Sequence, residues 1–271
     1  MSQRNFYFIT SSHPGRGTTL IEVMISLTLS FFLLGLVTAI YWATERHNER
    51  LTALTRLHAH SHFVLQKLAM EIQAAGFIGC PRLTADFPLG STIGASLTVA
   101  NKLELTPAAE GGTEVTVRHR SLKAAALGAP MMQSSVLEIA SSLPVSSGDW
   151  LLISDCRHAE LFQVAEVRSG GDWQRLTALR PLQYRYAENA EVGELEITRY
   201  AVEKTGRRDE VGQSLFALYR TDQRGHKTEL VTGIQQLKVA EQAAGRAVTL
   251  AIQASQAGFS KTEYGFVALR N

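Results

Sequence analysis

An apolar segment near the N-terminus constrains this chain more than any other feature. Between residues 18 and 44 the only ionisable side chains are those of Glu22 and Tyr41, and Ile25–Trp42 carries no charge at all. A helix needs about 20 such residues to cross a bilayer. The segment is too long for the apolar region of a secretory signal, and no small-residue cleavage site follows it. The sequence therefore predicts a membrane-spanning helix that stays attached to the chain.

The helical pattern continues beyond the apolar segment. No proline or glycine interrupts the residues from Glu45 until Gly76, and Gly79-Cys80-Pro81 then supplies a stop signal. Apolar residues recur mostly three or four positions apart, which is typical of one buried helix face. They are Leu51, Leu54, Leu57, Val64, Leu65, Leu68 and Ile72. We expect one helix from near Thr18 to near Ala75, roughly 85–90 Å long. Its membrane half is 18–44 and its amphipathic half is 45–79.

After Pro81 the pattern changes to short β-like runs separated by Gly, Asp, Asn and Ser. One further segment, Leu122–Leu127, is interpreted as a short helix or turn. The sequence thus predicts an α+β fold, with a long N-terminal helix packed on a predominantly antiparallel β-sheet domain at 80–271. The candidate strands are Ser96–Ala100, Leu103–Thr106, Glu114–Arg118, Ser135–Ala140, Trp150–Ser154, Leu161–Val167, Gln174–Leu179, Glu194–Val202, Ser214–Arg220, Glu229–Glu241, Ala247–Ala254 and Tyr264–Leu269.

The chain contains two cysteines, Cys80 and Cys156, which lie far apart and in no metal or redox motif. An even pair beyond a membrane anchor favours a disulfide in an oxidising compartment. The alternative is a pair of buried free thiols in a cytosolic domain.

Several classes of function find no support in the sequence. The net charge of +2 gives no general signal for nucleic acid, and 19% charged residues with 45% hydrophobic ones argue against disorder. No nucleophile elbow, zinc-protease or dinucleotide motif occurs. His58 and His62 lie one helical turn apart, but a bare pair is a weak metal signal. Arg207 and Arg208 belong to a modest basic cluster that we interpret as a solvated loop. We expect no catalytic residue, no metal and no cofactor.

The segment Gly15-Arg16-Gly17-Thr18-Thr19-Leu20-Ile21-Glu22 resembles the leader-cleavage site of type IV pilins and pseudopilins. The resemblance implies that a prepilin peptidase cuts after Gly17, so that residues 1–17 are a leader and Thr18 becomes an N-methylated terminus. The family usually begins its mature chain with Phe, and this chain departs from it at Thr18.

Glu22 acquires a role from this cleavage. A carboxylate in a membrane is costly unless it has a cationic partner. The resemblance implies that the partner is the new amino group of Thr18, either in the same subunit or in a neighbour. Such a pair would set the register in which a subunit docks into a filament.

The resemblance extends further along the chain and narrows the family. Residues 63–80, which end in Phe77-Ile78-Gly79-Cys80, and residues 153–164 around Cys156 resemble the two cysteine regions of PilW-type minor type IV pilins. Residues 230–239 and 267–271 also fit, but J-type minor pseudopilins of type II secretion share them.

The resemblance implies a non-enzymatic minor pilin that primes pilus assembly within a minor-pilin complex at the pilus tip. The implied partners are other minor pilins, the major pilin, the inner-membrane assembly platform, the prepilin peptidase and a tip adhesin. The implied location is the bacterial inner membrane, with the sheet domain in the periplasm, and then the pilus that supports twitching motility. The alternatives are a J-type pseudopilin and, in another class, a membrane-anchored receptor for DNA uptake or adhesion.

Overall fold

The computed structural model of the chain describes residues 19–80, 83–84, 86–91, 97–98, 100–108, 112–140, 143–208, 212–242, 246–256 and 258–269. The chain divides into two units, Met1–Thr52 and Ala53–Asn271. The boundary between the units falls within a single long helix.

This helix, α1 (Leu20–Ala74), has 55 residues and ends one residue before the predicted position. Gly76 follows with a φ of 72°, a left-handed conformation that suits glycine at a helix end. The buried positions within the second unit are Leu57, Ser61, Val64, Leu68 and Ile72. Leu51 and Leu54 were expected in this stripe but are exposed, so the buried face begins only at Leu57.

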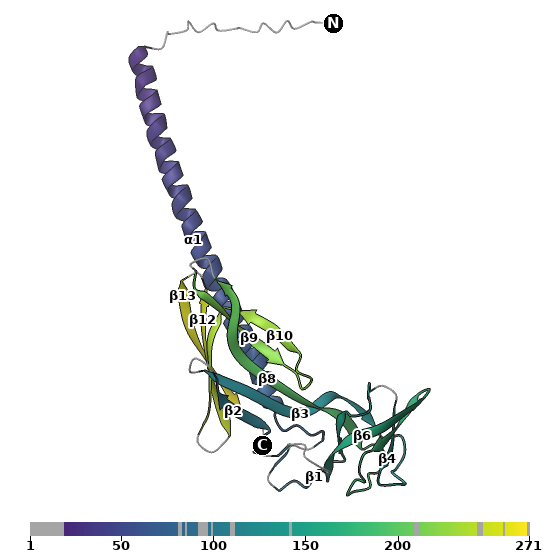
Figure 1. Ribbon diagram of the computed structural model, residues 1–271. Coiled ribbons are helices and arrows are strands. Elements are labelled where there is room, and N and C mark those ends of the chain that lie inside the picture. The colour runs from purple at the N-terminus through teal and green to yellow at the C-terminus, as the bar shows by residue number, and fades with distance from the viewer. Residues whose placement is uncertain are drawn as a thin grey trace, which may run out of the picture. The chain divides into compact units, whose positions relative to one another are not determined.

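Thirteen strands follow the helix among the described residues, and Figure 1 shows most of them. They are β1 (Leu89–Ser91), β2 (Leu103–Pro107), β3 (Thr113–Ala126), β4 (Val136–Ala140), β5 (Trp150–Ser154), β6 (Ala159–Gly170), β7 (Trp173–Ala178), β8 (Glu191–Arg208), β9 (Ser214–Thr221), β10 (Lys227–Thr232), β11 (Ile234–Glu241), β12 (Ala247–Gln256) and β13 (Phe259–Ala268).

The strands form two sheets. In the larger sheet the order is β10-β9-β8-β5-β6-β7-β4, while β3 pairs with β8, β2 with β3 and β1 with β6. Strand β8 is 18 residues long and has three neighbours, because β9 and β5 pair with different parts of it and β3 also pairs with it. The smaller sheet has the order β11-β12-β13. Every strand pair in the described residues is antiparallel except β1–β6.

The helix packs on these antiparallel sheets, which confirms the predicted α+β arrangement. One core cluster joins the buried helix face to residues of both sheets, including Leu68, Val117, Leu237 and Ile252. A second cluster fills the region of β4 to β7, around Phe162 and its neighbours. A third lies beyond the helix end, around Ile78.

Several predicted elements were wrong in detail. Leu122–Ala126 is the end of β3 rather than a helix or turn, because it pairs with β8 beyond an irregularity between Arg120 and Ala124. The single strand Glu229–Glu241 is two strands, separated at Gly233, whose φ is 81°. No strand occupies the described part of Ser96–Ala100, and β1 was not predicted.

Candidate functional site

The N-terminal part of α1 carries an unpartnered apolar surface. Its large side chains are exposed, with Leu20 at 80% and Phe31 at 73%. Hydroxyl groups within this segment donate to helix carbonyls, as Ser30 does to Ser26 and Thr38 does to Leu34, both at 2.7 Å. Polar groups in lipid need such internal partners. The helix is long and apolar enough to cross a membrane, and its most apolar stretch has no buried residue.

Glu22 lies on the first turn of α1, where it caps the helix. Its Oε2 accepts a hydrogen bond from the backbone N–H of Thr19 at 3.0 Å, and the Glu22 N–H donates to the Thr19 carbonyl at 3.0 Å. Thr19 and Glu22 therefore occupy the N-cap and third helical positions of a capping-box sequence. This geometry holds the carboxylate at the helix N-terminus, where the helix dipole stabilises negative charge. Gly17 and Thr18, the predicted cleavage site, lie outside the described residues.

The predicted disulfide is present. Cys80 and Cys156 are joined with an S–S distance of 2.00 Å and a Cα–Cα distance of 5.0 Å. The bond links the segment after α1 to the turn between β5 and β6, and both cysteines are exposed. Asp155 shapes this turn, because its Oδ1 accepts the backbone N–H groups of Arg157 at 3.0 Å and His158 at 2.8 Å. Asp155 is thus a turn residue.

A buried arginine lies beside the disulfide segment. Arg120, on β3, is only 3% exposed, and its Nη2 donates to Glu191 Oε2 at 2.7 Å. The guanidinium carbon lies 5.4 Å from the centre of the Phe77 ring. Gly79 has a φ of 119°, and a Cβ there would lie 2.4 Å from Ser154 Oγ and 3.1 Å from Arg120 Nη1. Only glycine fits this position, so the chain between the helix and Cys80 can pass directly over the arginine.

A charge cluster ties α1 to the larger sheet. Glu71, on the helix, accepts a hydrogen bond from Lys67 Nζ at 2.6 Å, and its other oxygen lies 3.8 Å from His119 Nε2 on β3. Glu196 of β8 approaches the same His119 nitrogen at 3.9 Å. Burial alone would raise the pKa of Glu71, but His119 and Lys67 overcome it and lower the pKa to about 2. Burial alone would lower the pKa of His119, but Glu71, the Arg120 carbonyl and Glu196 raise it above 6.5.

A second buried acid anchors the region next to the disulfide turn. Glu160, on β6, is fully buried, and its two oxygens accept the backbone N–H groups of Gln183 at 2.6 Å and Tyr184 at 3.1 Å. Burial raises its pKa, although these hydrogen bonds act in the opposite direction. Gly90 of β1 lies against it, since a Cβ there would come within 2.5 Å of Glu160 Cγ. Glu160 was not predicted as a site residue, and its only signal in the sequence is an acid within an apolar strand.

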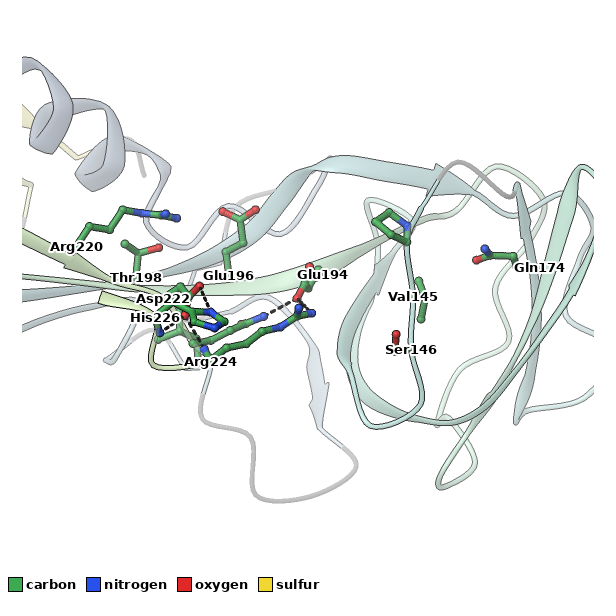
Figure 2. Close-up of a pocket in the computed structure, with 13 residues that line it drawn as sticks. Val145, Ser146, Gln174, Glu194, Glu196, Thr198, Arg220, Asp222, Arg224 and His226 are labelled. Carbon is green, nitrogen blue, oxygen red and sulfur yellow. Dashed lines mark hydrogen bonds and ion pairs between the residues drawn. The ribbon is translucent and has the colours of Figure 1, made fainter. Parts of the chain in front are cut away.

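A polar pocket of about 510 Å³ lies along β8 (Figure 2). Glu194, Glu196 and Thr198 line it from β8, and the β9–β10 turn contributes Arg224 and His226. The charged groups are engaged with one another: Arg224 lies 3.6 Å from Glu194. Burial raises the pKa of Glu194, and so do nearby acidic charges, although Arg224 acts in the opposite direction.

On α1, His58 of the candidate metal pair and the nearby His60 have separate partners. His58 lies 2.8 Å from Glu263 Oε1 of β13 and also contacts Lys261, whereas His60 Nδ1 lies 3.2 Å from the Thr232 carbonyl. Within the described ranges, no group of three or more His, Cys, Asp or Glu side chains is placed to hold a metal.

The basic residues near the end of β8 are engaged by acidic or carbonyl groups. Arg207 pairs with Glu229 at 2.5 Å, and Arg208 donates to the Gly212 carbonyl at 2.9 Å.

Comparison with known proteins finds no match to the chain among family models, curated proteins or solved structures.

Proposed function

We propose that this chain is a minor subunit of a type IV pilus, made as a prepilin and anchored in the bacterial inner membrane before assembly. The observation that carries the proposal is the single carboxylate on the first turn of a long, exposed, apolar helix. Such a helix leaves its apolar side chains for lipid or for neighbouring helices. A carboxylate at its start needs a cation when it leaves water.

In this proposal the two parts of the chain have separate tasks. The exposed part of α1 passes from the membrane into the filament core. The disulfide-linked sheet domain is held outside the membrane and meets other minor pilins, the major pilin and a tip adhesin. The subunit then primes pilus assembly from the inner-membrane platform, and it contributes structure rather than catalysis.

Glu22 is expected to act through its charge in assembly rather than through helix capping, and two variants separate these roles. Glu22→Gln keeps an oxygen that can accept the Thr19 N–H, but the neutral amide cannot form an ion pair with an ammonium group. Glu22→Ala loses both. Because truncating a buried ion pair costs about 3 kcal/mol, both variants should lower incorporation into sheared pili by at least about tenfold. Immunoblots of pilus and membrane fractions measure this.

The matched control is Ser30→Ala, which removes a hydroxyl from the same exposed helix and should assemble normally. If Glu22→Gln assembles like the wild type while Glu22→Ala fails, capping is the role and the register proposal is wrong. Normal assembly of both variants also contradicts it.

Leader removal gives the second prediction. Gly17→Leu should leave a membrane-bound precursor that is 17 residues longer than the mature subunit. We expect slower migration on a gel, with an N-terminal sequence that begins before Thr18. Gly35→Leu is the control, since a Cβ at Gly35 meets no atom within 4 Å and the processing site is untouched. Equal mobility of the Gly17 variant and the wild type would argue against cleavage.

The rival assignment, a J-type pseudopilin of a secretion system, predicts the opposite phenotype on deletion. Loss of surface pili and twitching with intact protein secretion supports the minor pilin. Loss of secretion with intact pili overturns it.

A further inference from the structure

The segment that carries Cys80 is held in place by contacts that do not involve the disulfide. The Gly76 N–H donates a hydrogen bond to the Arg118 carbonyl at 2.9 Å, and the Phe77 carbonyl accepts one from the Arg120 N–H at 2.7 Å. Strand β3 therefore binds the chain directly after α1. These backbone hydrogen bonds persist whether or not the sulfur atoms are joined.

The same segment packs on the strands that lead to Cys156. Ile78, two residues before Cys80, is fully buried in one core cluster with Leu152 of β5 and Leu161 of β6. Leu152 and Leu161 are cross-strand partners, and the turn with Cys156 joins their two strands. Burial of Ile78 against them brings the two cysteine segments together through apolar contact alone.

The turn that carries Cys156 has hydrogen bonds of its own. The Asp155 N–H donates to the His158 carbonyl at 3.1 Å, and the Asp155 carboxylate accepts the N–H groups of Arg157 and His158. The His158 ring stacks on the Tyr184 ring, with 4.2 Å between their centres. Local contacts therefore keep the shape of this turn without the disulfide.

The two segments touch each other next to the sulfur atoms. A Cβ at Gly79 would lie 2.4 Å from Ser154 Oγ, so the residue before Cys80 contacts the end of β5, two positions before Cys156. Gly79 and Ser154 are buried, whereas both cysteines are exposed. The contact that sets the spacing of the cysteines thus lies beneath the disulfide, and the disulfide itself faces solvent.

We propose that Cys80 and Cys156 form a redox pair that opens and closes within the folded chain, because the fold holds the two sulfur atoms together without the bond. An external dithiol supplies the electrons. Its thiolate attacks one sulfur, the S–S bond breaks, and the other sulfur leaves as a thiolate that takes up a proton. The second thiol of the dithiol then displaces the first sulfur. The protein gains two electrons and two protons, and the dithiol becomes a disulfide.

The pair makes stability depend on redox conditions while the folded shape stays the same. A disulfide acts mainly on the unfolded chain, so the reduced protein loses stability although its native contacts persist. Those contacts keep the two thiols adjacent, so an external disulfide can restore the bond without refolding. The inference concerns the sheet domain alone and does not depend on Glu22 or on leader cleavage.

The first test follows reduction of the native full chain in detergent micelles by dithiothreitol, with thiol labelling and mass spectrometry. The rate should rise in proportion to the dithiothreitol concentration and should stay unchanged in urea below the unfolding transition, because no unfolding precedes attack. The hydrogen-bonded amides of Gly76, Arg120 and Asp155 should exchange less than about tenfold faster after reduction. A rate that levels off with dithiothreitol or rises with urea, or full loss of this protection, would overturn the proposal.

Gly79→Ala tests whether the buried contact sets the spacing of the thiols. The added Cβ would collide with Ser154 Oγ and push the segments apart, so closure of the reduced pair by oxidised glutathione should slow by at least about tenfold. Mass spectrometry of acid-quenched samples measures closure. Gly128→Ala is the matched control, because a Cβ at Gly128 meets no atom within 4 Å, and it should close like the wild type.

Asp155→Ala tests the other segment and serves where Gly79→Ala does not fold. It removes the two hydrogen bonds from the turn amides to the carboxylate, so it should also slow closure. Closure at the wild-type rate in every folded variant would show that the contacts around the cysteines do not hold the thiols together, and the proposal would then be wrong.

Discussion

Replacing Cys80 and Cys156 by serine is expected to lower the free energy of unfolding of the sheet domain by about 4 kcal/mol. The two bonded cysteines are 76 positions apart in the sequence. Closing a loop of that size removes much of the conformational entropy of the unfolded chain. It also fixes the segment after α1 to the β5–β6 turn. Both sulfur-bearing residues are exposed, so a reductant can reach the bond without prior unfolding.

Urea unfolding of the full chain in detergent, followed by tryptophan fluorescence, measures the loss. Trp150 and Trp173 report on the sheet domain, and Trp42 in the apolar part of α1 adds a background signal. The reduced wild type should match the Cys80→Ser, Cys156→Ser variant, and the m-value should rise because the uncrosslinked unfolded chain exposes more surface. Ser147→Ala is a control, because this hydroxyl bonds the Ala165 carbonyl on the surface. A shift of less than about 1 kcal/mol in both the variant and the reduced wild type would contradict the prediction.

The helix and the class of fold were predictable because their signals are local. An apolar run followed by a three-and-four spacing specifies a helix whatever surrounds it. The end of the stripe was harder to place. Leu51 and Leu54 have the right spacing, but the sheets that bury the helix face contact it only from about Leu57 onward.

The misassigned segment shows how tertiary pairing overrides local preference. Lys123-Ala124-Ala125-Ala126 has high helix propensity, and it was therefore expected to be a helix or turn. In the structure Ala124, Ala125 and Ala126 pair with Gly193, Val192 and Glu191 of β8. The partner strand lies more than sixty residues away, so no local pattern could reveal it.

Some candidate site residues were likewise predictable from the local sequence, and others were not. Glu22 was predictable because an acid in an apolar segment is conspicuous, and the capping geometry adds Thr19 as its partner. Arg120 and His119 were not, because their acidic partners Glu191 and Glu71 come from distant elements. A charged residue in a β-like run indicates only that it needs a partner if it is buried. Which residue becomes that partner depends on the fold.

The ion pair between Glu71 and His119 should stabilise the fold most within one range of pH. Its contribution should fall at both lower and higher pH. The pKa of Glu71 is about 2 in the folded chain against an ordinary 4.5. Its contribution is therefore complete above pH 4.5 and is lost as the pH falls toward 2. The pKa of His119 is raised, so its contribution is complete below 6.5 and is lost as the pH rises through the folded value. Maximal stability from this cluster should lie between about pH 4.5 and 6.5.

Glu71→Gln should remove about 3 kcal/mol at pH 6, because the Glu71 side chain is only 14% exposed and its pKa shift corresponds to that energy. The variant should also lose most of the acid dependence between pH 4.5 and 2, since no carboxylate remains at that position to be protonated. His119→Gln should flatten the alkaline side instead. Urea midpoints measured from pH 2 to 8 test both slopes.

The matched control for the acid side is Glu166→Gln, which breaks an exposed ion pair with Arg168 at 2.8 Å. Exposed ion pairs are screened by solvent and contribute little to stability, so this variant should keep the wild-type pH profile. If Glu71→Gln retains the full acid dependence, the proton uptake belongs to other carboxylates. The helix would then be held to the sheet by apolar packing around Val64, Leu68 and Ile72, with the cluster adding little.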